Sequence, residues 1–171
     1  MAEKKDVQKL KHPIAPFFSP QSKVIILGSF PSPKSRETGF YYGHPQNRFW
    51  NVMASLFLEN TPETIPEKKA MLERHGIALW DVIKECNISG ASDSSIKSAL
   101  PNDIAYLAAC TEAKAVFLTG KTAFSLYTRY CSDTVNLPYF ALPSTSAANA
   151  AFSCERLTEC YRVILKYLDL Q

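Results

Sequence analysis

Four short apolar runs, separated by segments with helical spacing, constrain the fold of this chain more than any other feature. They lie at residues 23–28, 77–83, 114–119 and 138–142. Apolar runs of this length bounded by turn residues are typical of buried strands. Between and after them, helices are expected over 48–58, 66–75, 101–110, 121–130 and from Ser153 to Leu168. Strands that alternate with helices predict an α/β fold with a parallel sheet and helices on both faces.

Length and charge set broad limits on the class of protein. The chain has 171 residues, enough for one domain with a full core, which we place at 13–171 behind a flexible N-terminal arm at 1–12. No apolar run approaches the roughly 20 residues needed to span a bilayer. The polar, basic N-terminus does not resemble a secretory signal, so a cytoplasmic location is expected. A net charge of +3 is compatible with nucleic acid without demonstrating it.

The cysteines and histidines do not form a metal-binding pattern. Five cysteines are present, without a CxxC pair, and the three histidines stand apart from them. An odd cysteine count without paired spacing argues against a disulfide framework. We therefore expect reduced thiols packed mostly on helix faces, and no metal or cofactor.

The stretch 28–50, GSFPSPKSRETGFYYGHPQNRFW, is the candidate functional loop. It follows the first predicted strand and lacks helical or strand periodicity. A loop this long inside a compact domain is usually functional or disordered, and its aromatic residues argue against disorder. In open α/β sheets, ligands bind at the carboxyl ends of the strands, where such loops lie.

Individual residues of this loop allow two interpretations each. Asn47 is either a helix N-cap or a neutral amide in a pocket, where it offers both a donor and an acceptor. Phe40, Tyr41 and Tyr42 are either core residues or include a ring that stacks on a nucleobase. Three adjacent aromatics cannot all face one core from a regular strand, so at least one should face outward or line a pocket.

Two later segments carry weaker signals. Gly120-Lys121-Thr122 resembles the end of a phosphate-binding loop, but Ala115 stands where that motif needs glycine, so an ordinary helix start is expected. The loop of small residues at 143–150 contains serines, and a nucleophilic serine needs a general base within reach. His44 is a conceivable general base, but nothing in the sequence connects it to these serines. This loop is suited to binding phosphate through hydroxyl and N–H groups, or it is a plain connection.

Several motifs together resemble the uracil-DNA glycosylase superfamily. They are the strand 24–27, Gly28-Ser29-Phe30-Pro31, Thr38-Gly39-Phe40 and the string HPQNRFW at 44–50. The resemblance resumes at 76–81, 117–124, 142–146 and 161–162, and so covers nearly the whole domain. It implies a three-layer α/β/α sandwich with a four-stranded parallel sheet and no metal.

The third position of the first motif separates branches of that superfamily. The mismatch-specific uracil/thymine branch has a catalytic asparagine there, whereas this chain has Phe30, and a phenyl ring cannot orient water. Gly-Ser-Phe-Pro-Ser instead resembles the hypoxanthine-DNA glycosylase branch, whose catalytic asparagine corresponds to Asn47. The second motif, 142–149, is also similar to that branch, with Ala147 where proline is common.

The resemblance implies a monofunctional DNA glycosylase of base excision repair that hydrolyses the N-glycosidic bond of a flipped, deaminated base, with hypoxanthine preferred. It implies a monomer acting on double-stranded DNA, with no membrane contact. The residues implied are Asn47 for catalysis; Gly28, Ser29, Phe30, Pro31 and Tyr42 for the base pocket; and Ser144, Thr145, Ser146 and Asn149 for DNA binding. A uracil or mismatch-specific glycosylase and a catalytically weak nucleic-acid binding module stay open as alternatives.

Overall fold

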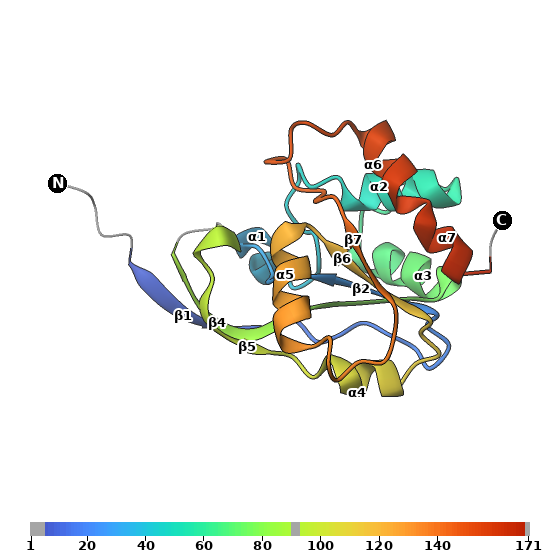
Figure 1. Cartoon of the computed structure of the whole chain (residues 1–171). Coiled ribbons are helices and arrows are strands. Elements are labelled where there is room, and N and C mark those ends of the chain that lie inside the picture. The colour runs from blue at the N-terminus through green and yellow to red at the C-terminus, as the bar shows by residue number, and fades with distance from the viewer. Residues whose placement is uncertain (1–5, 90–92, 170–171) are drawn as a thin grey trace.

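A four-stranded parallel sheet lies at the centre of the protein (Figure 1). The computed structural model describes residues 6–89 and 93–169. The strand order is β3-β2-β6-β7, with the bounds β2 Val24–Gly28, β3 Ile77–Asp81, β6 Ala115–Thr119 and β7 Tyr139–Leu142. All three strand pairs are parallel, which confirms the predicted sheet.

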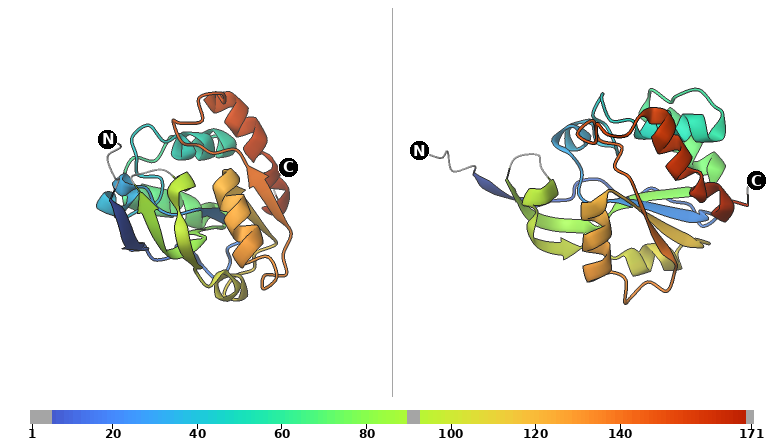
Figure 2. Two further views of the ribbon diagram at one scale, coloured as in Figure 1. Left: turned by 60° about the vertical axis from the view of Figure 1, so that its left-hand side comes forward. Right: turned by 45° about the horizontal axis from the view of Figure 1, so that its top comes forward.

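Helices cover both faces of this sheet, as the three-layer prediction requires (Figures 1 and 2). One layer holds α2 Phe49–Phe57, α3 Ile65–His75, α6 Cys154–Tyr161 and α7 Val163–Tyr167. The other holds α4 Ile104–Ala109 and α5 Lys121–Tyr130. Because side chains alternate along a strand, Ile26 packs into the first layer while Ile25 and Leu27 pack into the second. All three side chains are fully buried.

A second, antiparallel sheet was not predicted. It has the order β1-β4-β5, formed by β1 Val7–Lys11, β4 Ile83–Ser89 and β5 Lys97–Pro101. Residues 1–12 were expected to form a flexible arm. Residues 1–5 lie outside the described part of the chain, whereas residues 7–11 pair with β4 throughout. Residues 87–99 were expected as a polar loop. Residues 90–92 lie outside the described part of the chain, and the others include the end of β4, the 3-10 turn η1 Asp93–Ser95 and the start of β5. Strands β1 and β5 have no buried residues, and register shifts interrupt the pairing of β4 with β5. These strands therefore lack the clean two-residue alternation that would have revealed them in the sequence.

The helices also differ from the sequence prediction in three places. The long loop contains a short helix, α1 Pro33–Thr38, capped by the Ser32 hydroxyl and ended by Gly39 at φ 79°. Six residues are too few to show helical periodicity. Helix α4 begins at Ile104 because Pro101 belongs to β5 and Asp103 is the N-cap. The last predicted helix breaks at Arg162 into α6 and α7.

The described part of the chain has no helix long and apolar enough to cross a membrane. Among those same residues, no group of three or more histidine, cysteine or acidic side chains is placed to hold a metal ion. In the described part of the chain, no disulfide joins any of the five cysteines. Cys86 and Cys131 are buried, whereas Cys160 is exposed on α6.

Candidate active site

A cleft of about 1270 Å³ opens where the strands of the parallel sheet end. The loop after β2 forms one wall, and the loop after β7, residues 143–153, arches from the sheet towards α6 and forms another (Figure 1). The structure brings every predicted site residue to this cleft: Gly28, Ser29, Phe30, Pro31, Tyr42, Asn47, Ser144, Thr145, Ser146 and Asn149. Two segments about a hundred positions apart in the chain therefore meet across one cavity.

The Asn47 side chain has a different environment at each end of its amide. Its Oδ1 accepts hydrogen bonds from the Phe49 backbone N–H at 2.9 Å and from the Thr145 hydroxyl at 2.8 Å. A backbone N–H can only donate, so the oxygen is identified and both its lone pairs are used. The Asn47 NH2 group has no hydrogen-bond partner among residues 6–89 and 93–169. The side chain therefore offers the cleft a neutral donor.

Both interpretations of Asn47 thus apply, to different atoms. Arg48 occupies the N-cap position of α2 and makes no side-chain cap. Asn47, one position earlier, supplies the oxygen that satisfies the Phe49 N–H. The first turn of α2 binds the carbonyl oxygen of the Asn47 amide through the Phe49 N–H. The NH2 group at the other end of the amide is therefore available to the cleft.

Tyr42 is the half-exposed member of the aromatic run. Its ring stacks on Phe49 with centroids 3.8 Å apart and planes 12° from parallel. Its hydroxyl forms a 3.0 Å hydrogen bond with Thr119 Oγ1 at the end of β6. The backbone adopts φ 53°, a left-handed conformation uncommon outside glycine, and this turn separates Tyr42 from the buried Phe40 and Tyr41. The ring is thus supported by Phe49 and lines the cleft.

Asp81 is a cleft residue that sequence reasoning missed. It ends β3, is buried, and accepts a 2.7 Å hydrogen bond through Oδ2 from Nε2 of His12, whose side chain is also buried. His12 Nδ1 accepts from the Ile14 N–H at 3.2 Å, so the ring proton is on Nε2. In the described structure, Asp81 Oδ1 has no hydrogen-bond partner. The cleft therefore also contains a carboxylate acceptor.

The closeness of Asp81 explains the glycine at position 28. A Cβ on Gly28 would lie 2.5 Å from Asp81 Oδ1, a separation that real Cβ atoms do not show. The neighbouring carbonyls are engaged, since Gly28 O and Ser29 O accept from the N–H groups of Val82 and Ile83. The available signal for Asp81 was a lone acidic residue within the apolar run 77–83. His12 gave none, because its partner is 69 positions away.

Buried tyrosine hydroxyls act as donors at the edges of the site. Burial raises the pKa of Tyr41 well above its ordinary value, and the nearby negative charge of Asp81 adds to the rise. Burial likewise raises the pKa of Tyr161. Both phenols therefore stay protonated, and they donate 2.8 Å hydrogen bonds to the carbonyls of Ala15 and Pro143 respectively. The second of these bonds ties α6 to the start of the 143–153 loop.

Arg48 was also missed, and it holds the second loop in place. Its guanidinium donates to the carbonyls of Ser146 at 2.8 Å and Asn149 at 3.0 Å, and to that of Phe152. Its backbone N–H donates to the Thr145 carbonyl at 3.0 Å. Asn149 adds an internal bond from its NH2 to Ser144 O at 2.9 Å. The loop carbonyls therefore converge on one arginine from the first loop.

The remaining candidate chemistries find little support in the geometry. His44 is exposed, and its Nδ1 accepts from the Gln46 N–H at 3.1 Å. Ser144 Oγ accepts from the Ser146 N–H at 3.2 Å. No hydrogen bond joins His44 to Ser144 in the described residues, so this pair is not arranged as a nucleophile and its base.

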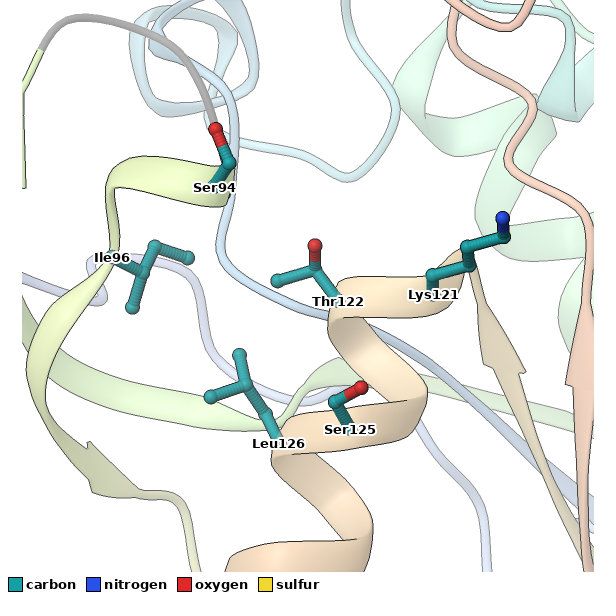
Figure 3. A pocket seen from close by; sticks show the side chains of 6 residues that line it. All are labelled: Ser94, Ile96, Lys121, Thr122, Ser125 and Leu126. Atoms are coloured by element: carbon teal, nitrogen blue, oxygen red, sulfur yellow. The ribbon is translucent and has the colours of Figure 1, made fainter.

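The Gly120-Lys121-Thr122 segment is the start of α5, as predicted. Beside it lies a smaller hollow of about 300 Å³, between the helix and the η1–β5 segment (Figure 3). Its lining includes the polar residues Ser94 and Ser125 and the apolar residues Ile96 and Leu126. Ala115, where a phosphate-binding loop would need glycine, is the buried first residue of β6. Lys121 and Thr122 also line the main cleft and extend its polar rim.

Comparison with known proteins gives a consistent family. The family model for the uracil DNA glycosylase superfamily matches residues 15–167. A hypoxanthine DNA glycosylase from Methanosarcina acetivorans is 32% identical over 142 residues, covering 81% of this chain and 87% of the relative. Its counterpart from Methanosarcina barkeri is 33% identical over 98 residues, covering 57% and 62%.

The fold has a counterpart among solved structures. The solution NMR structure of a candidate uracil DNA glycosylase from Methanosarcina acetivorans is 28% identical, with a TM-score of 0.80. The match covers 95% of this chain and 99% of that one. The chain belongs to the uracil DNA glycosylase superfamily.

Proposed function

We propose that this protein is a monofunctional DNA glycosylase that removes hypoxanthine from DNA by hydrolysing its N-glycosidic bond. The name of the Methanosarcina relatives favours this substrate. The observation that carries the proposal is the pair of unmatched polar groups in one cleft. Asn47 offers an NH2 donor and Asp81 a carboxylate acceptor, beside the ring of Tyr42.

The donor suits the leaving base. A target base must leave the duplex and enter a pocket before its glycosidic bond can be reached. Cleavage then separates charge, leaving an oxocarbenium-like sugar and an electron-rich base. A positioned donor that meets the developing negative charge lowers the barrier. The Asn47 NH2 is such a donor, and because both lone pairs of its oxygen are occupied, the amide does not take a proton from water.

The acceptor suits a deaminated base edge. Deamination of adenine replaces the N1 lone pair with an N1–H group and the amine with a carbonyl. The free Asp81 Oδ1 would accept from N1–H and repel the N1 lone pair of adenine. Uracil and xanthine carry a similar N–H, so discrimination among these bases falls to pocket shape. Phe30 is 6% exposed and supplies an apolar wall there.

The second loop would hold the DNA strand. The hydroxyls of Ser144 and Ser146 accept bonds from loop N–H groups, which leaves their O–H groups to donate to phosphate. Lys121 adds a cation on the same cleft. Asn149 contributes by bracing the loop from within.

Single-turnover base release tests the proposal. Matched duplexes would carry one inosine, uracil, xanthosine or adenosine nucleotide, and abasic sites would be scored after alkaline cleavage. We expect fastest release from the inosine duplex and none from the adenine duplex. Asp81→Asn should narrow the gap between hypoxanthine and adenine, because an amide can donate to N1 as well as accept from N1–H. Tight binding of the inosine duplex without release of any base would support a binding module and overturn the proposal.

A further inference from the structure

We infer that Thr145 is a positioning residue for Asn47, a role that rests on the proposed function. Thr145 is 1% exposed, and its hydroxyl donates to Asn47 Oδ1 at 2.8 Å. A buried hydroxyl that already donates cannot also donate to a phosphate. Thr145 therefore differs from Ser144 and Ser146, although the three stand together in the chain.

Thr145 forms hydrogen bonds to both Asn47 and Arg48, one through its hydroxyl and the others through its carbonyl. Its hydroxyl bonds to the Asn47 side chain, and its carbonyl accepts the Arg48 backbone N–H at 3.0 Å and Nε at 3.4 Å. Arg48 in turn bonds to carbonyls further along the same loop. The side chain of Asn47 is thus joined to the second loop at the point where that loop is itself braced.

Two donors constrain the amide more than one does. The last torsion of asparagine has a broad energy profile, so the Phe49 N–H alone would leave the amide plane free to swing. The Thr145 hydroxyl occupies the second lone pair of Oδ1 and fixes the plane. It also excludes a water molecule from that lone pair. Hydrogen bonds to the oxygen polarise the amide, which makes its N–H groups stronger donors.

Catalysis would therefore depend on contact between the loop after β2 and the loop after β7. Asn47 and Thr145 are 98 positions apart, and their bond forms only when the 143–153 loop lies against the start of α2. The loop that would hold the DNA strand therefore also sets the direction of the amide that would act on the base.

Two substitutions separate this role from simple packing. Thr145→Val keeps the shape and removes the hydroxyl, whereas Thr145→Ser keeps the hydroxyl. We expect Thr145→Val to slow single-turnover hypoxanthine release about tenfold, the equivalent of one net hydrogen bond, with duplex affinity unchanged. Thr145→Ser should stay within about twofold of the wild type. Thr111→Val is the matched control, since its hydroxyl bonds only to backbone carbonyls in α4, and its rate should not change.

A double-mutant cycle provides the sharper comparison. If Thr145 acts through Asn47, Thr145→Val should cause no further slowing in an Asn47→Ala background. A full tenfold loss in that background would overturn the inference, as would equal rates for wild-type and Thr145→Val proteins. If the wild-type protein released no base at all, the proposed function would be refuted instead.

A readout independent of activity keeps the inference testable in either case. The side-chain NH2 signals of Asn47, identified by their loss in Asn47→Ala, can be followed by ¹⁵N NMR in the full chain. We expect them to shift and broaden in Thr145→Val and to persist in Thr145→Ser and Thr111→Val. Unchanged signals in a folded Thr145→Val protein would overturn the positioning role.

Discussion

Replacing Asn47 by aspartate or alanine separates the two ends of its amide. The carbonyl oxygen supports the fold through Phe49 N–H and the Thr145 hydroxyl, and the NH2 faces the cleft. Aspartate keeps an oxygen in the supporting position and removes the donor. Alanine removes both. Both substitutions remove the donor but only alanine removes the supporting oxygen, so stability and base release should respond separately.

The magnitudes follow from these contacts. Losing an acceptor at a helix start costs about 1 kcal/mol, and an orphaned buried hydroxyl costs about 1–3 kcal/mol. Asn47→Ala should therefore lower the free energy of unfolding by roughly 2–4 kcal/mol, which corresponds to about 4–16 °C in Tm for a chain of this size. Asn47→Asp should unfold close to the wild-type temperature. Both should slow base release by about 10²–10³, the usual effect of losing one positioned transition-state donor.

Thermal unfolding followed by circular dichroism and single-turnover release from an inosine duplex measure the two effects. Release by Asn47→Asp at the wild-type rate would show that the NH2 group is not the catalytic donor. A Tm for Asn47→Asp as low as that of Asn47→Ala would show that the oxygen contacts do not support the fold.

Three further substitutions test the pocket. Phe30→Asn should lower hypoxanthine release with at most a slight gain on uracil, because an unmatched amide in an apolar wall costs about 1–3 kcal/mol; strong uracil release with hypoxanthine release unchanged would refute this. Tyr42→Ala should weaken binding of the inosine duplex by roughly 1–3 kcal/mol, because the ring that stacks on the flipped base is lost. Tyr42→Phe keeps the ring and should change the affinity little. Equal effects of the two substitutions would rule out stacking. Gly28→Ala should displace the Asp81 carboxylate and reduce release at least tenfold, and a crystal structure showing Asp81 in its wild-type position would contradict that reasoning.

The sequence alone determined the central sheet and the location of the site. The four strands of the parallel sheet are short apolar runs bounded by turn residues, a pattern that neighbouring residues carry by themselves. The end of α3 at Gly76 was equally local, since glycine adopts the left-handed conformation seen there at φ 69°. The functional loop was recognisable because a long aromatic, aperiodic segment after a strand is unusual. Its motif also pointed to Asn47.

Only the tertiary structure decided which groups of the site are available. The β1–β4–β5 sheet pairs residues 7–11 with a segment that looks polar and irregular in sequence. Asp81 accepts a hydrogen bond from His12, which is 69 positions away in the chain. The hydroxyl of Thr145 donates to Asn47, which is 98 positions away. Such contacts leave no periodic trace along the chain, because they depend on how loops pack and not on neighbouring residues. For that reason the sequence identified Asn47 as a candidate, while the fold determined that its NH2 group faces the cleft.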